Sequence, residues 1–266
     1  MFREITIGQY YPADSLLHRL DPRVKLFFTL FYMIGIFVAD NIFAFSLLTV
    51  GLFSAVKLSK VPFGYMVKGL QAIILLLIIA GAFNMFLTPG QTLATVGPLT
   101  ITDVGLKNAG LMTARMIYLI IGTSLMTLTT TPNRLTDGLE TSLGPLQKLN
   151  VPVHEIALMM SIALRFIPIL VEETDKIMKA QMARGADFET KGLVRKAKAM
   201  VPLLVPLFVS AFRRASDLAM AMEARCYHGG EGRTKMKPLH YSKEDRVAYL
   251  LILLFFAGVV VLRILF

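Results

Sequence analysis

Residues 26–56 read LFFTLFYMIGIFVADNIFAFSLLTVGLFSAV, and Asp40 is the only charged residue among them. The apolar stretches on either side of it, 26–39 and 41–56, are each shorter than a perpendicular transmembrane helix of about 20 residues. Both therefore need flanking residues to cross a bilayer. We interpret them as two spans joined by a tight hairpin at Asp40. A single long tilted helix is the alternative.

The composition supports an integral membrane protein. Of 266 residues 55% are hydrophobic and only 17% are charged, and the mean hydropathy is +0.61. The single cysteine, Cys226, excludes an intramolecular disulfide and gives no thiolate metal cluster. Residues 1–21 hold no apolar stretch of signal-peptide length, so we expect no cleaved leader.

Three further apolar stretches predict further spans. They are residues 71–87, 105–130 and 247–262. The stretch 105–130 carries Arg115, which we expect to face the helix bundle or to extend toward the interface. Segment 88–104 contains two adjacent pairs of proline and glycine, and these predict a loop.

The positions of Lys and Arg predict the orientation. Basic residues precede the first span and lie between the second and third, whereas the loop 88–104 has none. Residues 131–246 hold 18 of the 28 Lys and Arg and 13 of the 18 Asp and Glu. Five spans with a cytoplasmic N-terminus place every basic segment inside. The net charge of +10 follows from this orientation, and no nucleic-acid motif accompanies it, so we expect the bilayer and no nucleic acid as a partner.

Region 131–246 is expected to form three helices, near 133–147, 153–184 and 191–226. The apolar stretches 156–164 and 199–212 are too short to span, and this favours packing on the membrane bundle or lying at its interface. Internal prolines are expected to kink the two longer helices.

The predicted fold class is an all-α integral membrane protein with about five transmembrane helices plus three cytoplasmic or interfacial helices. The predicted domains are a membrane domain of four spans over 1–130, a cytoplasmic helical region over 131–246 and a final span within 247–266.

Catalytic and cofactor signatures are missing from the sequence. It has no P-loop, HExxH or GxSxG motif, and its four histidines have no ligand-like spacing, so we predict no catalytic residue, cofactor or metal. The spans hold few ionisable groups, whereas ion-coupled carriers use such groups near mid-membrane. This scarcity argues against a stand-alone secondary carrier or channel, which is the alternative function.

Two tripeptides close the two long helices. Each places an arginine after an alanine and before a polar loop, and they read Ala183-Arg184-Gly185 and Ala224-Arg225-Cys226. A cation at a helix C-terminus complements the helix dipole, and glycine suits the turn that ends a helix, so each tripeptide alone is ordinary capping. Their recurrence instead favours two slim ends whose guanidinium groups bind a partner.

The chain resembles the transmembrane coupling subunits (EcfT family) of energy-coupling factor (ECF) transporters over nearly its whole length. Four segments carry the resemblance: Leu20-Asp21-Pro22-Arg23-Val24-Lys25-Leu26, Ser161-Ile162-Ala163-Leu164-Arg165-Phe166-Ile167-Pro168, Gln181-Met182-Ala183-Arg184-Gly185-Ala186-Asp187 and Ala221-Met222-Glu223-Ala224-Arg225-Cys226-Tyr227. The last two resemble the paired Ala-Arg-Gly coupling motifs of the family and are the most specific.

The resemblance implies a non-catalytic subunit of an ATP-driven vitamin or micronutrient importer in a prokaryotic cell membrane. It implies that the ends bearing Arg184 and Arg225 dock into two ABC-type ATPases, which bind the ATP. The long helices would cross and cradle a separate substrate-binding membrane subunit (S-component). Cys226 stands where the family has glycine, so the second helix is expected to end differently or to run one residue further.

Counting back equally from the two ends aligns Glu173 with Arg214. If the long helices cross at that level, these two side chains can pair. The alternative is two independently solvated charges.

Overall fold

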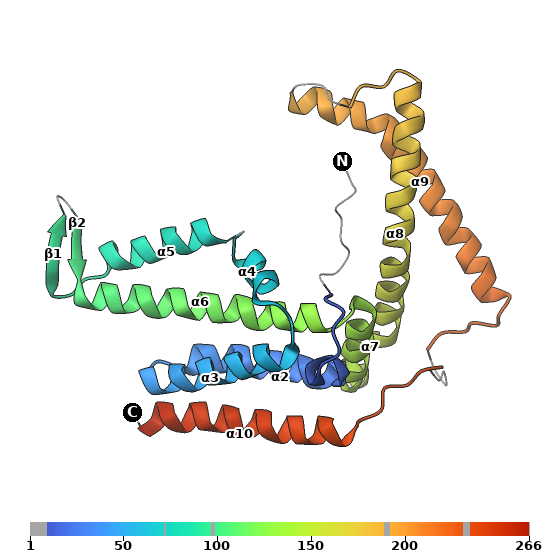
Figure 1. Cartoon of the computed structure of the whole chain (residues 1–266). Helices are drawn as coiled ribbons and strands as arrows, with labels where there is room; N and C mark the ends of the chain where they lie inside the picture. Colours follow the sequence, from blue (N-terminus) through green and yellow to red (C-terminus); the bar gives the residue numbers. More distant parts are fainter. Residues whose placement is uncertain (1–9, 72, 97–98, 189–191, 231–234, 266) are drawn as a thin grey trace. The chain divides into compact units, whose positions relative to one another are not determined.

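The computed structural model describes residues 10–71, 73–96, 99–188, 192–230 and 235–265. By their internal contacts the residues form two units. The membrane unit lies within Gly8–Leu139 and Leu239–Phe266, and the long-helix unit is Glu140–Pro238. Figure 1 labels most of the helices and strands of both units.

The membrane unit is helical apart from one small hairpin. Its elements are α1 (Leu16–Arg19), α2 (Pro22–Val38), α3 (Ile42–Ser59), α4 (Phe63–Gln71), α5 (Ile74–Leu87), β1 (Thr92–Val96), β2 (Leu99–Thr102), α6 (Asp103–Thr129), most of α7 (Pro132–Leu143) and α10 (Lys243–Leu265). Because α2 and α3 are separate helices joined at 39–41, the interpretation of 26–56 as a helical hairpin is confirmed.

The chain is a multi-pass membrane protein by the length and composition of its helices. Five described helices are long and apolar enough to cross a bilayer: α3, α6, α10 and two helices of the long-helix unit, α8 (Val153–Ala183) and α9 (Leu193–Glu223). The pair α4 and α5 adds a sixth if it counts as one broken span. The all-α membrane fold is therefore confirmed, whereas α2, with 17 residues, is shorter than these five helices.

The predicted start of the third span is wrong. We expected one continuous helix over 71–87, but Gln71 ends α4, and α5 begins at Ile74 at an angle of 64° to it. Gly69 and the polar Gln71 precede the break, and glycine weakens a helix interior by about 1 kcal/mol. The 14 residues of α5 are about 21 Å long, so a crossing here needs both helices.

The segment expected as a loop contains an antiparallel β-hairpin. β1 pairs with β2 from Thr92↔Thr102 to Val96↔Leu99, with an irregularity between Thr92 and Ala94. Threonine and branched apolar residues favour extended backbone, and they outweigh the neighbouring glycines and prolines as a signal here.

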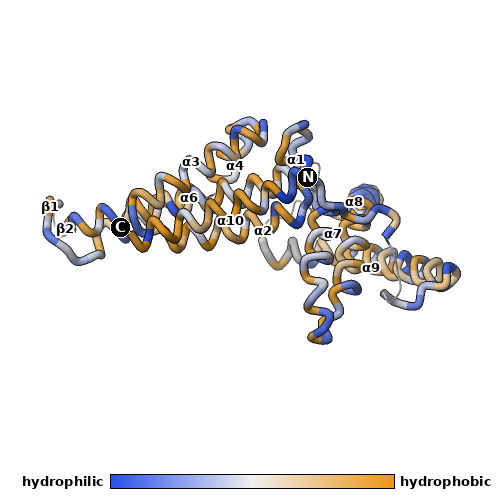
Figure 2. The backbone as a smooth tube through the Cα atoms, turned by 90° about the horizontal axis from the view of Figure 1, so that it is seen from below, coloured by the Kyte–Doolittle hydropathy of each residue, from blue (hydrophilic) through white to orange (hydrophobic). Residues whose placement is uncertain are grey.

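The core of the membrane unit lies among α2, α3, α6 and α10. Its fully buried side chains include Ile36 of α2, Leu48 of α3 and Val259 of α10. A side chain at Gly122 of α6 would overlap the ring of Tyr32, so glycine lets α2 and α6 approach closely. Figure 2 shows hydrophobic residues along α3, α6 and α10, whose outward faces expose large apolar side chains. Such faces suit lipid contact.

One end of the membrane unit is fastened by buried carboxylates. The Asp21 side chain caps α2 by accepting the Arg23 N–H at 2.9 Å, and Pro22 occupies the first helical turn. The Asp21 N–H donates to Asp245 at the start of α10 (2.8 Å), and Asp245 also accepts from Ser242. These bonds hold the starts of α2 and α10 together.

The opposite end is fastened by Asp40, which lies in the turn between α2 and α3. Its carboxylate is 3.3 Å from Arg115 of α6 and 3.4 Å from Arg263 of α10. Arg115 also donates to the Ala39 carbonyl at 3.0 Å. The expectation that Arg115 faces the bundle is thus confirmed, and its partner is the hairpin turn.

The long-helix unit holds the end of α7, a 3₁₀ helix η1 (Gly144–Leu149), α8 and α9. α8 and α9 have 31 residues each, longer than their apolar stretches. The argument that those stretches are too short to span therefore does not apply to the whole helices, and their interfacial placement remains a prediction. Figure 1 shows α9 bent in its first half, which contains Pro202 and Pro206.

Candidate functional site

The C-terminus of α8 forms a Schellman motif around the first tripeptide. The Gly185 N–H donates to the Met182 carbonyl (2.9 Å), and the Ala186 N–H donates to the Gln181 carbonyl (3.0 Å). Gly185 has φ +90°, a conformation that glycine adopts without strain. Arg184 is therefore the C-cap residue, fixed where the chain leaves the helix.

The C-terminus of α9 repeats this hydrogen-bond pattern. The Cys226 N–H donates to the Glu223 carbonyl (2.9 Å), and the Tyr227 N–H donates to the Met222 carbonyl (3.1 Å). Cys226 has φ +56°, so it adopts the left-handed conformation despite its side chain. The helix is assigned to Glu223, but Ala224 keeps helical angles, so Arg225 occupies the same position as Arg184. The expectation of a different or longer end is therefore wrong.

All six residues of the two tripeptides are exposed. Among the described residues, the guanidinium groups of Arg184 and Arg225 make no hydrogen bond or ion pair. Each presents its fork of N–H donors to solvent, and such a fork suits a carboxylate or a set of backbone carbonyls. The arrangement can therefore bind an acceptor-rich groove without first breaking an internal contact.

α8 and α9 are connected by an ion pair between Arg214 and Glu173. This pair was predicted by counting back equally from the two ends, and the structure confirms it. Each member lies eleven residues before its tip arginine, since 184 − 173 and 225 − 214 are both 11. The two helices thus cross at matching levels, and Figure 1 shows their C-terminal ends lying apart.

A second polar contact in the long-helix unit was not predicted. Glu140 of α7 is 2.8 Å from His154 of α8 and 2.7 Å from Lys235 in the segment after α9. Burial raises the pKa of Glu140, but the bonds from Lys235 and His154 outweigh it and hold the pKa below its usual value. The carboxylate therefore stays charged and ties together three parts of the unit that are distant in sequence.

Space at this contact depends on a glycine. A side chain at Gly230 would overlap the His154 ring, so the segment after α9 approaches α8 closely only with glycine there. The sequence showed Gly229-Gly230 as a loop signal but gave no sign of which helix the loop approaches. Over the described ranges, no three His, Cys, Asp or Glu side chains are placed to hold a metal ion.

Comparison with known proteins assigns the family. The family model CbiQ, described as cobalt transport protein, matches residues 13–236. Proteins named energy-coupling factor transporter transmembrane protein EcfT are similar over most of the chain. The one from Thermosediminibacter oceani is 51% identical over 248 residues, covering 93% of this chain and 94% of that protein.

The chain belongs to this family. The EcfT protein of Clostridium kluyveri is 52% identical over 252 residues, covering 94% of this chain and 93% of its own length. That of Bacillus subtilis is 49% identical over 246 residues, covering 92% and 93%. The resemblance found in the four sequence segments is thus confirmed, and the protein is a membrane component of the ECF transporter family.

Proposed function

We propose that this chain couples ATP hydrolysis by two ABC-type ATPases to a substrate-binding S-component in an importer of vitamins or other micronutrients. Its role is non-catalytic, and the ATPases bind the ATP. The coupling residues are Ala183, Arg184 and Gly185 at the end of α8, and Ala224, Arg225 and Cys226 at the end of α9.

The observation that carries this proposal is the duplication of one geometry. Two helices of equal length end in the same Schellman turn, and each presents an arginine with no internal partner among the described residues. Capping alone requires neither the repetition nor the match in distance from the Arg214–Glu173 pair. Two equivalent ends suit a pair of similar partners.

Transmission follows from the crossing of α8 and α9. When the ATPases close on ATP and reopen after hydrolysis, the docked helix ends move with them. Because α8 and α9 cross at Glu173 and Arg214, displacement of the ends changes the angle between the helices. The apolar surface of both helices, which we place against the S-component, then changes shape and favours substrate release inside the cell.

The decisive experiment removes the two guanidinium groups. Arg184→Ala and Arg225→Ala should leave the helices intact, because both side chains are exposed and make no hydrogen bond or ion pair among the described residues. Losing a charged hydrogen-bonding partner at a desolvated interface costs roughly 2–5 kcal/mol, so ATPase co-purification should fall at least tenfold. In liposomes holding the ATPases and an S-component, uptake of that S-component's vitamin should fall with it, most strongly in the double variant.

Matched controls are available on the same helices. Lys176→Ala on α8 and Arg213→Ala on α9 remove exposed charges eight and twelve residues before the tip arginines and should leave association and uptake unchanged. Full uptake by the double tip variant would show that the tips are only helix caps. Equal losses in tip and control variants would mean that the total positive charge of the two helices, and not the tip arginines, determines ATPase association.

We propose a prokaryotic plasma membrane location with the N-terminus in the cytoplasm. The membrane domain is 1–130, the coupling region 131–246 and the last span lies in 247–266. The basis is the distribution of Lys and Arg. In intact cells a membrane-impermeant maleimide should label Thr92→Cys in the hairpin and spare the native Cys226. Permeabilisation should expose both, and labelling of Cys226 alone in intact cells would reverse the topology.

A further inference from the structure

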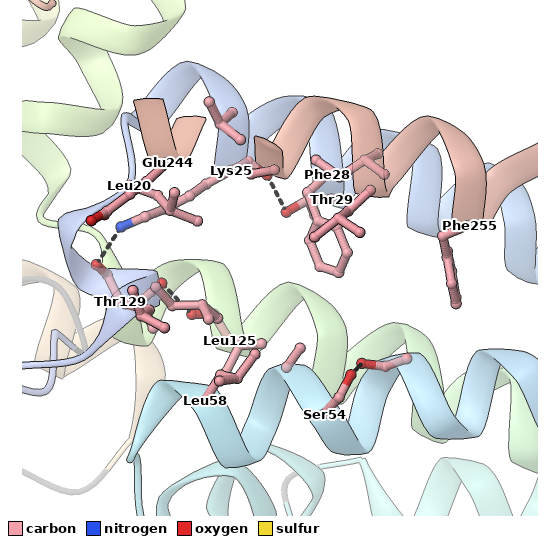
Figure 3. A pocket seen from close by; sticks show the side chains of 18 of the residues that line it. Leu20, Lys25, Phe28, Thr29, Ser54, Leu58, Leu125, Thr129, Glu244 and Phe255 are labelled. Carbon is pink, nitrogen blue, oxygen red and sulfur yellow. Dashed lines mark hydrogen bonds between the residues drawn. The ribbon is translucent and has the colours of Figure 1, made fainter. Parts of the chain in front are cut away.

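A cavity of about 830 Å³ lies inside the membrane unit and belongs to neither helix tip. It is lined by α1, α2, α3, α6 and α10 and opens to the surface. Its wall is mainly aliphatic and aromatic, with Phe28, Leu58, Leu125 and Phe255 among the contributors (Figure 3). A space of this kind in a membrane protein attracts an apolar occupant.

The hydroxyl groups in this wall do not make it polar. Thr29 donates to the Lys25 carbonyl, Ser54 to the Gly51 carbonyl and Thr129 to the Leu125 carbonyl, each at 2.8 Å. Each hydroxyl is thus turned back onto its own helix. Away from the lysines, the wall therefore offers an occupant mainly van der Waals contact.

The charged groups of the cavity come from the first turns of α2 and α10. They are Lys25, Lys243 and Glu244, so two cations face one anion. The Lys25 ammonium donates to the Thr129 carbonyl at 2.9 Å and the Thr130 hydroxyl at 3.2 Å. Neither lysine forms an ion pair with a carboxylate among the described residues. Figure 3 shows Lys25 and Glu244 together, away from Ser54 and Phe255.

We propose that this cavity is a binding site for one phospholipid with an anionic headgroup. An acyl chain fills the apolar interior, and the headgroup lies beside Lys243, within the field of the Lys25 charge. Basic pockets between membrane helices select anionic headgroups by this charge complementarity. The occupant bridges α2, α3, α6 and α10, so it stabilises the membrane unit without any ATPase or S-component.

Binding can be measured by native mass spectrometry on the delipidated full chain. Dioleoyl phosphatidylglycerol and dioleoyl phosphatidylcholine serve as probes, because they share acyl chains and differ in headgroup charge. We expect one phosphatidylglycerol to be retained per chain, with at least tenfold preference over phosphatidylcholine. No retained phospholipid, or equal retention of both, would overturn the proposal.

Two filling variants test the location. Ala248→Phe on α10 and Ser54→Leu on α3 place bulk inside the cavity from opposite walls, and each should reduce retention at least tenfold. Ala257→Phe and Ser46→Leu change exposed residues of the same helices outside the cavity and should retain the lipid. Comparable loss in the filling and control variants would assign the lipid to the outer surface.

A charge variant tests the headgroup. Lys243→Gln should reduce the preference for phosphatidylglycerol about fivefold, the effect of one basic residue near an anionic headgroup. Arg246→Gln removes an exposed cation from the same turn of α10 that does not line the cavity, and it should leave the preference unchanged. An unchanged preference in Lys243→Gln would contradict the assigned headgroup position.

Discussion

The membrane unit and the α8–α9 pair are stabilised in different ways. In the most apolar stretch of α3, 33% of the residues are buried, against 6% in the corresponding stretch of α9. Polar contacts fasten both ends of the membrane unit, at Asp245 and at Asp40, whereas α8 and α9 are joined by the partly exposed Arg214–Glu173 pair. The membrane unit therefore resembles a packed core, and the α8–α9 pair resembles half of an interface.

The exposed surface of α8 and α9 sharpens this contrast. Large apolar side chains remain uncovered along both helices: Met159, Met160, Val201, Val205, Phe208, Val209 and Phe212. An apolar surface of this extent requires lipid or a protein partner. Elements that bury little of their apolar surface are also the ones that move most readily within a fold.

The largest expected effect is on the membrane unit. Asp245→Ala should lower its free energy of unfolding by about 3 kcal/mol, because a buried carboxylate that accepts from Asp21 and Ser242 is lost and these donors are left without it. Unfolding in mixed micelles measures this, with Arg246→Ala as the control. A loss below about 0.5 kcal/mol would show that the Asp245 contact does not stabilise the membrane unit.

A smaller effect is expected at the Glu140 contact. Glu140→Gln should destabilise the link to His154 and Lys235 by about 2 kcal/mol. The folded pKa of Glu140 lies below its ordinary value of 4.5, so its contribution is present at neutral pH and is lost as the pH falls below 4.5. The protection of amides at the start of α8 against hydrogen exchange, relative to the intrinsic rate at each pH, should fall in acid in the native chain and change less in the variant.

The next effect concerns the turns that end α9 and α8. Cys226→Gly should stabilise the Schellman turn by about 1 kcal/mol, because a non-glycine residue at φ +56° carries that strain. Slower amide exchange at Tyr227 would register the gain. Gly185→Ala should have the opposite sign at the end of α8, where φ is +90°. Destabilisation by Cys226→Gly would mean that the cysteine side chain contributes contacts of its own.

The smallest effect is at the crossing of α8 and α9. A double-mutant cycle with Glu173→Ala and Arg214→Ala should give a coupling energy of about 0.5–1 kcal/mol, because the pair is partly exposed. The stability of the assembled complex provides the measurement. Zero coupling would show that the two side chains do not stabilise the crossing. A coupling energy above about 3 kcal/mol would indicate that the pair is buried.

The sequence was sufficient for features that depend on local patterns. Apolar stretches interrupted by Asp40 predicted the α2–α3 hairpin, and equal counting from the two tripeptides predicted the Glu173–Arg214 pair. Both predictions succeeded because helical periodicity and end signals are encoded within a few turns.

Features that depend on distant partners were missed. Asp21 and Asp245 are 224 residues apart, and neither position differs in pattern from an ordinary helix cap. The contact of Glu140 with Lys235 was missed for the same reason, because the two residues are far apart in the sequence. The β-hairpin was missed for another reason: proline and glycine signals were weighted above the threonine-rich pattern beside them.

The equal spacing of the two tips from the crossing has a mechanical consequence. Eleven residues of helix span about 16 Å, so Arg184 and Arg225 end two lever arms of the same length with a common fulcrum at Glu173 and Arg214. A rotation of about 10° at the fulcrum displaces either end by about 3 Å along its arc. Because the arms are equal, one change in the crossing angle displaces both arginines by the same distance, and neither end has a longer reach than the other.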